Sequence, residues 1–302
     1  MKANADVFLI GGGDLRGDVE SLLDRLPVGD VAGKTVAVKA NFNSADPFPA
    51  STDPATLGAM IEIVADNNPE RIVLAERSGM GATLRVLERC GVFDLVKENG
   101  FSVVILDELG EEGWVKVVRD GFHWRRGFLI ARLFVEAGAV VQTCCLKAHR
   151  FGGHITMSLK NSVGMVAKYD PKDGYNYMQE LHTSPAQRLM IAEINSAYDP
   201  AFILLDARKG FSTGGPDRGT TISPGLLIAG TDRVAVDAVG VALLRAHGST
   251  REVTRGPVFA QEQIARAAEL GLGVKSPHDI RLHGLDAQGE AAAGIIRGIL
   301  DA

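Results

Sequence analysis

The chain has 302 residues, of which 46% are hydrophobic and 23% charged, a composition typical of a globular protein with a large core. A net charge of −5 without a basic tract argues against a nucleic-acid partner, and no apolar stretch reaches the ~20 residues that a membrane span requires. Three cysteines, two of them adjacent, and no N-terminal signal pattern lead us to expect a cytoplasmic protein without membrane partners.

Segments with strand and helix periodicity alternate along the whole chain. Strands are predicted at 7–10, 35–38, 71–75, 101–106, 115–118, 139–146, 201–205, 226–230 and 280–282. Helices are predicted at 18–26, 54–67, 83–90, 128–137, 156–166, 185–196, 233–246 and 259–270. This alternation indicates an α/β fold with a largely parallel sheet and helices on both faces. We expect one α/β domain over residues 1–302, and an arrangement in two lobes is left open.

The segment 147–166 concentrates polar and ionisable residues directly after the predicted buried strand 139–146. Its candidate site residues are Lys147, His149, His154, Lys160 and Asn161, with a glycine pair between the two histidines. A polar, glycine-containing loop between a strand and a helix is where open α/β sheets place their ligands. Each residue taken alone would be an ordinary surface or core residue, but their density at a strand end predicts a functional site.

Polar residues also follow the other predicted strands. They are Lys39, Asn41 and Asn43 after the second strand, Glu76 and Arg77 after the third, and Asp107, Asp206 and Asp232 after later ones. If the sheet is parallel, these residues fall along one edge of it. We therefore expect them to join the segment 147–166 in one site.

These residue types suit proton transfer on an anionic substrate. His149 is the candidate general acid or base, and Lys147 and Lys160 would bind or activate the substrate. Substrate-binding roles are predicted for Lys39, Asn41, Glu76, His154 and Asn161. Asp206, Asp232 and Asp237 would supply a carboxylate or metal ligands, and helix capping or turn formation is the alternative for the first two.

Because cysteines and histidines lie close together in this segment, a structural zinc site is a further alternative. Cys144 and Cys145 are adjacent on a predicted strand, so their side chains point to opposite faces and only one could join His149. The chain lacks the cysteine spacing of a ferredoxin-type iron–sulfur cluster. The cofactor is therefore left unassigned.

Three blocks of the sequence resemble the family known as domain of unknown function 362. They are Lys39-x-Asn41 with the helix start at 52–54, the segment from Leu146 to Gly164, and the region 206–237, which contains Gly-Thr-Asp-Arg-Val-Ala-Val-Asp. The resemblance covers roughly residues 35–275. Many members carry ferredoxin-type cysteine motifs and are labelled iron–sulfur proteins. This chain departs from them by lacking these motifs, so electron transfer does not carry over from the resemblance.

The central segment is also similar to the nickel-pincer lactate racemases in its histidine, paired glycines and Lys160-x-x-x-Gly164 pattern. In those enzymes histidines do acid–base work and a lysine holds the cofactor, although the spacing here differs.

These observations predict an enzyme that acts on a small anionic or polar metabolite by general acid–base chemistry. The alternative is a non-catalytic binding protein or a redox-accessory protein that presents the same groove to a partner. A deep pocket lined by Lys147, His149 and Asp206 would favour the enzyme, and a shallow groove beside a large exposed apolar patch would favour the partner protein. A homo-oligomer is left open.

Overall fold

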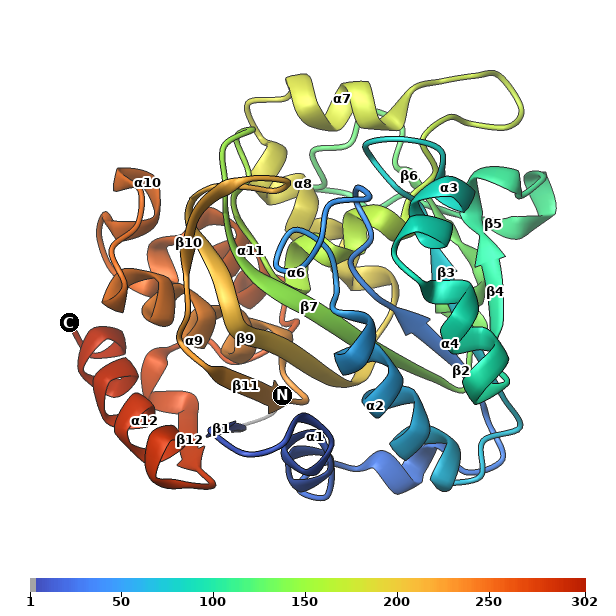
Figure 1. Ribbon diagram of the computed structural model, residues 1–302. Coiled ribbons are helices and arrows are strands. Elements are labelled where there is room, and N and C mark those ends of the chain that lie inside the picture. The colour runs from blue at the N-terminus through green and yellow to red at the C-terminus, as the bar shows by residue number, and fades with distance from the viewer. Residues whose placement is uncertain (1–3) are drawn as a thin grey trace.

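The computed structural model describes residues 4–302, and within them ten strands form one twisted sheet (Figure 1). The order along the main path is β12-β1-β11-β9-β7-β2-β3-β4. The strands on this path are β1 (Ala5–Gly11), β2 (Thr35–Lys39), β3 (Arg71–Glu76), β4 (Ser102–Ile105), β7 (Ala139–His149), β9 (Pro200–Gly214), β11 (Leu226–Gly230) and β12 (Ile280–Gly284). All of them run in one direction except β11, which is antiparallel to both β1 and β9. The α/β fold with a largely parallel sheet is thus confirmed.

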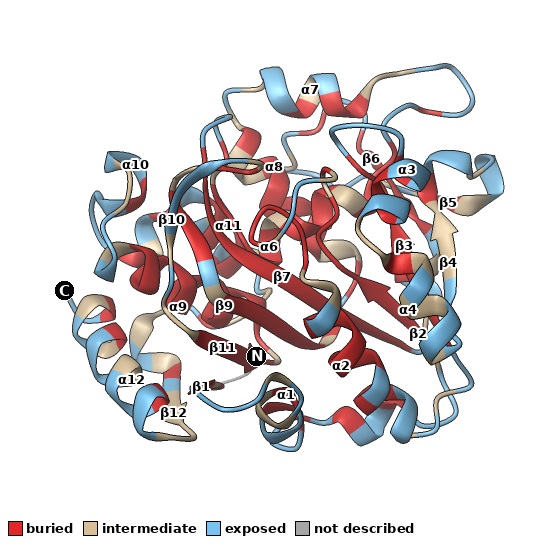
Figure 2. Cartoon of the chain, viewed as in Figure 1, coloured by how far each residue is buried: buried red, intermediate tan, exposed pale blue. Residues whose placement is uncertain are grey.

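Helices cover both faces of this sheet because its strands are apolar on both sides. One face packs against α1 (Leu15–Leu23), α2 (Pro54–Asp66) and α4 (Val92–Asn99). The other packs against α9 (Arg233–Ala246), α11 (Glu262–Glu269) and α12 (Ala287–Leu300) on one half. The second half of that face packs against α7 (Tyr177–Thr183) and α8 (Gln187–Ile194). Figure 2 shows β7 and β11 buried between these layers, whereas β4, β10 and a short part of β9 are partly or fully exposed, as are the outer helix surfaces and loops.

The long strands β7 and β9 extend beyond their neighbours and carry short hairpin partners. β8 (His154–Thr156) folds back on β7, with Lys147 opposite Thr156, and β10 (Gly219–Ile222) folds back on β9. Next comes α6 (Ser158–Asn161), which continues as a 3-10 turn over 162–165. The helix predicted at 156–166 is therefore shorter and less regular than expected, because its first residue belongs to the hairpin.

Two other predicted elements differ. The segment 128–137 was predicted as one helix, but β6 (Phe128–Ala131) pairs with β5 (Trp114–Val117) in a separate two-stranded sheet before α5 (Arg132–Glu136) begins. Every residue of β6 is buried, and a short apolar run fits a buried strand as well as a helix. The strand predicted to end at Asp206 runs on through the glycine-containing segment to Gly214.

Among residues 4–302, no helix has both the length and the apolar character that crossing a bilayer requires.

Candidate functional site

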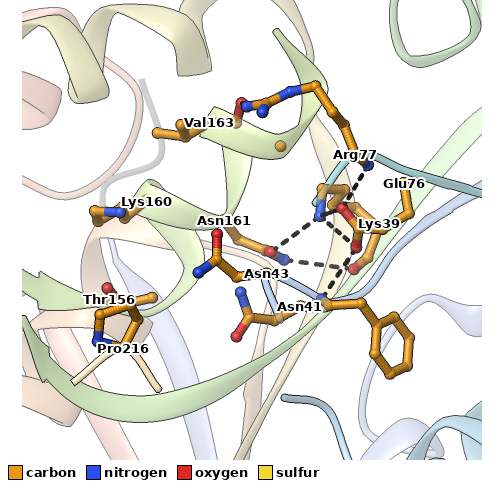
Figure 3. A pocket seen from close by; sticks show the side chains of 12 residues that line it. Lys39, Asn41, Asn43, Glu76, Arg77, Thr156, Lys160, Asn161, Val163 and Pro216 are labelled. Atoms are coloured by element: carbon orange, nitrogen blue, oxygen red, sulfur yellow. Dashed lines mark hydrogen bonds and ion pairs between the residues drawn. The ribbon is translucent and has the colours of Figure 1, made fainter. Parts of the chain in front are cut away.

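The strands β2 and β3 end side by side in a buried ion pair. Lys39 Nζ lies 2.6 Å and 2.8 Å from the two carboxylate oxygens of Glu76, and both residues are 1% exposed. Lys39 Nζ also lies 3.3 Å from Asn161 Oδ1 (Figure 3). Burial lowers the pKa of Lys39 and raises that of Glu76, while their mutual attraction opposes both shifts. The pair stabilises the edge of the sheet where ligands bind in folds of this class.

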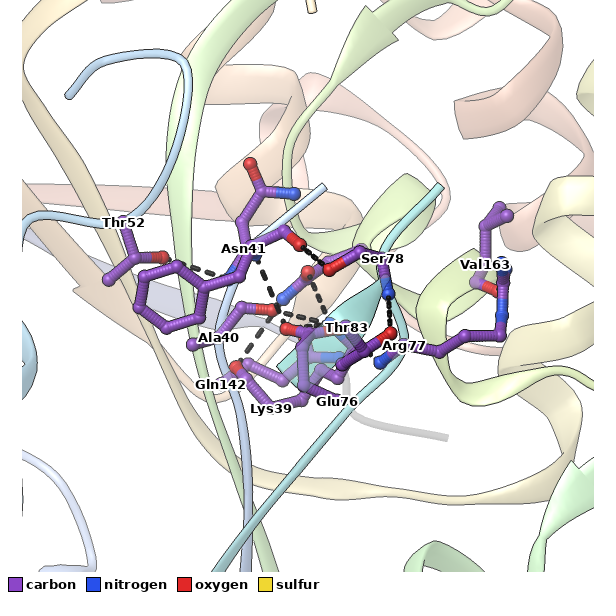
Figure 4. A network of polar contacts seen from close by, with 12 residues as sticks. Lys39, Ala40, Asn41, Thr52, Glu76, Arg77, Ser78, Thr83, Gln142 and Val163 are labelled. Carbon is purple, nitrogen blue, oxygen red and sulfur yellow. Dashed lines mark hydrogen bonds and ion pairs between the residues drawn. The ribbon is translucent and has the colours of Figure 1, made fainter. Parts of the chain in front are cut away.

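Backbone amides complete the surroundings of the Glu76 carboxylate. The amides of Arg77 and Phe42 donate to it at 2.9 Å and 3.3 Å (Figure 4). Arg77 then turns its guanidinium toward the turn after α6, where Nε donates to the Val166 carbonyl and Nη2 to the Val163 carbonyl, both at 2.8 Å. Arg77 is 4% exposed, so it joins the sheet edge to α6 from inside the protein.

A carboxylate on the opposite helix fixes α6. Asp237 of α9 accepts hydrogen bonds from the backbone amides of Ser158 at 2.8 Å and Leu159 at 3.0 Å. These amides have no partner within the helix, so the carboxylate caps its first turn. Burial raises the pKa of Asp237 to about 7, although the two amides oppose the shift. The cap thereby holds the next two residues, Lys160 and Asn161, at the sheet edge.

Two adjoining cavities open over this edge. The inner one has a volume of about 40 Å³ and the outer one about 270 Å³, and they share Asn43, Arg77, Lys160, Val163 and Pro216. The inner cavity is also lined by Lys39, Asn41, Phe42, Glu76, Thr156, Asn161 and Gly164. The outer one is also lined by Gly79, Met80, His149, Phe151, Lys168, Met178 and His182. Among the described residues that line them, Glu76 is the only acidic one, and it is already paired with Lys39.

Lys160 lies where the two cavities meet, and its amine has no hydrogen-bond or ion-pair partner among residues 4–302. Burial, followed by repulsion from the cations of Lys147 and Arg77, lowers the pKa of Lys160 to about 7. Figure 3 shows Lys160 and Lys39 on opposite sides of Asn161. A lysine that is half protonated near neutral pH can give or take a proton, or act as a nucleophile.

Two further polar atoms near Lys160 are buried without a partner in the described structure: His149 Nδ1 and Thr156 Oγ1. Burial, followed by the positive charge of Lys160, holds the pKa of His149 far below its usual range, so its ring is neutral in the empty pocket. A Cβ at Gly153 would lie 2.9 Å from Lys160 Cε and 3.0 Å from His149 Nδ1, so glycine lets both groups approach the hairpin. Buried polar atoms without partners are uncommon, and these two have hydrogen-bonding capacity that no described residue uses.

Residues 36–242 match the family described as domain of unknown function (DUF362). The chain belongs to this DUF362 family. No curated protein matches the sequence. Among solved structures, the chain is similar to the lactate racemase apoprotein from Thermoanaerobacterium thermosaccharolyticum, with 16% sequence identity and a TM-score of 0.43. The match covers 68% of this chain and 50% of that one, so the chain spans about half the length of that protein.

Not every residue predicted for the site of this DUF362 chain reaches the cavities. Lys147 is fully buried, and its amine donates to Asn41 Oδ1 at 2.5 Å and to the Ala50 carbonyl at 2.6 Å. These contacts hold the loop after β2, and Lys147 lines neither cavity; its role in binding or activating a substrate stays a prediction. His154 has a left-handed backbone with φ of 62° and lines neither cavity, contrary to expectation. Burial, followed by the positive charge of Arg188, lowers the pKa of His154.

The three aspartates predicted as metal ligands are apart from one another. Asp206 accepts hydrogen bonds from Thr56 Oγ1 at 2.6 Å and Arg208 Nη2 at 2.7 Å, and it lines neither cavity. Asp232 caps α9 through the amides of Val234 and Ala235, at the opposite edge of the sheet because β11 runs antiparallel. Asp237 caps α6 through Ser158 and Leu159. Within residues 4–302, no group of three histidine, cysteine or acidic side chains is arranged to hold a metal ion.

The cysteines do not combine with the histidines. Cys144 packs in the core under α9, whereas Cys145 lies on the other face near Thr52, as strand alternation predicts. Burial raises the pKa of both thiols, that of Cys145 to about 11, which keeps them protonated.

Several cavity residues had no predicted role. Arg77 and Asn43 were recognised as polar residues after strands, and their position was the signal that could have placed them in the site. Phe151, Met178 and His182 come from a hairpin loop and from α7, and no local pattern links them to β2 or β3. The fold alone brings them together.

Proposed function

We propose that this protein is an enzyme that binds a small anionic metabolite in the two joined cavities and moves a proton with Lys160. The observation that carries this proposal is the position of the Lys160 amine, which lies at the junction of the two cavities and has no partner among residues 4–302. Glu76 is the one acidic residue that lines the cavities, and its charge is neutralised by Lys39.

The charges around the cavities select for an anion. Arg77 and Lys160 line both cavities, Lys168 lines the outer one, and none of these three cations forms an ion pair with a carboxylate of residues 4–302. A carboxylate or phosphate group on a ligand would relieve the repulsion that lowers the pKa of Lys160. The amide groups of Asn43 and Asn161 add donors and acceptors that suit hydroxyl or carbonyl oxygens.

The roles that we propose for Lys160 and His149 differ from those predicted from the sequence. Lys160 is the better candidate for the titrating acid or base because its pKa of about 7 matches neutral conditions. His149, whose pKa is strongly lowered by burial, would serve the substrate as a neutral hydrogen-bonding partner through Nδ1. The Lys39–Glu76 pair and Asn161 would position α6 and the substrate rather than react.

Hydrogen exchange tests this proposal although the substrate is unidentified. The purified protein is incubated in D₂O with a panel of small 2-hydroxy, 2-oxo and phosphorylated acids, and loss of the proton next to the carboxylate or carbonyl group is followed by NMR. We expect exchange with at least one acid, its loss in Lys160→Met, and its retention in the exposed control Lys172→Met. Exchange that persists unchanged in Lys160→Met, or a panel without exchange, would refute the proposal.

The partner-protein alternative has less support. It requires a shallow groove beside a large apolar patch, whereas the inner cavity is lined by polar side chains of β2, β3, β8 and α6. The exposed apolar residues near them, Met80 and Phe151, line the outer cavity. The pocket expected of an enzyme is present only in part, because it is lined by His149 but not by Lys147 or Asp206.

A further inference from the structure

We propose that the Lys160 amine forms a covalent imine with the carbonyl carbon of a small oxo acid. This inference rests on the proposed function, because it uses the same site, and it names the substrate class and the form of catalysis.

The three lysines at this sheet edge have three different surroundings. Lys39 is paired with a carboxylate, and Lys147 donates to an amide oxygen and a backbone carbonyl. Both amines thus already have hydrogen-bond acceptors within the protein. Only Lys160 reaches the junction of the cavities with no acceptor among residues 4–302, a setting that favours the free amine. A neutral amine with an open path to a cavity is what attack on a carbonyl requires.

The same junction offers a place for the carboxylate of an oxo acid. Arg77 lines both cavities, and its Nε and Nη2 are used by backbone carbonyls. Its Nη1 has no hydrogen-bond partner among residues 4–302, and no carboxylate in that range pairs with the guanidinium. Because a planar cation favours a carboxylate, Arg77 would hold the acid group while the adjacent carbonyl carbon lies near Lys160.

The two unpartnered polar atoms suit the proton steps. The lone pair of Lys160 Nζ forms the new C–N bond, and the carbonyl oxygen takes up a proton to give a carbinolamine. The C–O bond then breaks, one water molecule leaves, and the nitrogen lone pair forms the C=N bond. His149 Nδ1 and Thr156 Oγ1 can relay the protons, because both lie buried beside Lys160 without partners in the described structure. The condensation balances with water as its only by-product and needs no oxidant or reductant.

An imine would also make the proton on the neighbouring carbon easier to remove. Protonated C=N withdraws electrons from the neighbouring carbon and acidifies its C–H bond, so a weak base can remove the proton. Once its nitrogen is part of the imine, Lys160 can no longer take this proton itself. Neutral His149, whose Nδ1 lies beside Lys160, is the group left to accept it.

Reductive trapping tests the imine on the whole chain. The protein is incubated with pyruvate or phenylpyruvate and sodium cyanoborohydride, which reduces imines, and the adduct is located by peptide mass mapping. We expect one reduced adduct per chain on Lys160, none in Lys160→Arg, and full labelling in Lys172→Arg, which changes an exposed lysine outside the cavities. Mapping of the unmutated protein identifies the modified lysine even if Lys160→Arg fails to fold.

The outcomes separate this inference from the proposed function. If an acid exchanges its proton in D₂O but Lys160 stays unlabelled, or if other lysines are labelled in its place, the imine is wrong and proton transfer stands. If neither exchange nor trapping occurs, both are wrong.

Discussion

Lys160 Cε and His149 Nδ1 both lie within about 3 Å of the point where Gly153 would carry a Cβ atom. The glycine therefore leaves room for a lysine from α6 and a histidine from β7 to approach each other.

Gly153→Ala should impair function more than stability. The added methyl group would displace the flexible end of Lys160 and press on the imidazole of His149, which costs no more than about 1–2 kcal/mol of unfolding free energy. Exchange and trapping should fall at least tenfold, as measured by NMR and mass spectrometry. Gly294→Ala, where a Cβ meets nothing within 4 Å, is the matched control and should leave both unchanged. Equal activity in the two variants would argue against a working Lys160–His149 pair.

At pH values above 7, the protein should take up a proton when it binds an anion. The groups around the Lys160 amine are cationic or neutral: Lys147, Arg77, His149 and His182. Burial, followed by the charges of Lys147 and Arg77, lowers the pKa of Lys160 to about 7 in the free protein. A bound anion raises this pKa again, so the amine is protonated on binding. Affinity for an unreactive acid should then fall by up to tenfold for each pH unit above 7.

Calorimetry in buffers of different ionisation enthalpy measures this uptake. Lys160→Met should abolish the buffer dependence at pH 8. Proton release on binding, or uptake that survives in Lys160→Met, would assign the titration to another group.

Glu76→Gln should destabilise the fold. The substitution leaves the buried Lys39 ammonium without its carboxylate, at a cost of about 3–5 kcal/mol of unfolding free energy. Urea denaturation measures the change. Asp94→Asn removes the partner of the exposed Lys97 and should have little effect. Similar midpoints for the two variants would mean that the buried pair does not stabilise the sheet edge.

Asp237→Ala should release α6. Two buried backbone amides would lose their acceptor, which costs about 2–4 kcal/mol, and Lys160 would lose its fixed position. We expect lower denaturation midpoints together with weaker anion binding. Asp232→Ala provides the comparison, because it uncaps α9 at the other edge of the sheet and should destabilise without a specific change in the pH dependence of binding. Normal binding by a folded Asp237→Ala protein would contradict the positioning role of the cap.

Sequence periodicity located most of the strands. It therefore predicted the edge of the sheet at which Lys39, Glu76, His149 and Lys160 lie. It failed for Asp232 because nothing in an apolar run tells parallel from antiparallel pairing, and β11 is reversed. It failed for Asp206 because the glycines after it continue β9 rather than end it.

The sequence also could not predict which side chains point into the cavities. His149 and His154 lie opposite each other on the two strands of one hairpin, but only His149 lines a cavity. Lys147 lies on β7 at the expected edge, yet the loop that follows β2 surrounds its amine. The order of ionisable residues along a chain does not reveal which of them remain open to a ligand.

The most direct test of the account is the titration of the lysine amines by NMR after isotope labelling of lysine. We predict one signal that titrates near pH 7, moves to higher pH when an unreactive carboxylic acid is added, and is absent in Lys160→Met. If the Lys160 signal titrates near the ordinary lysine value of 10.5, the amine is not free at neutral pH and both its proton-transfer role and the imine are contradicted.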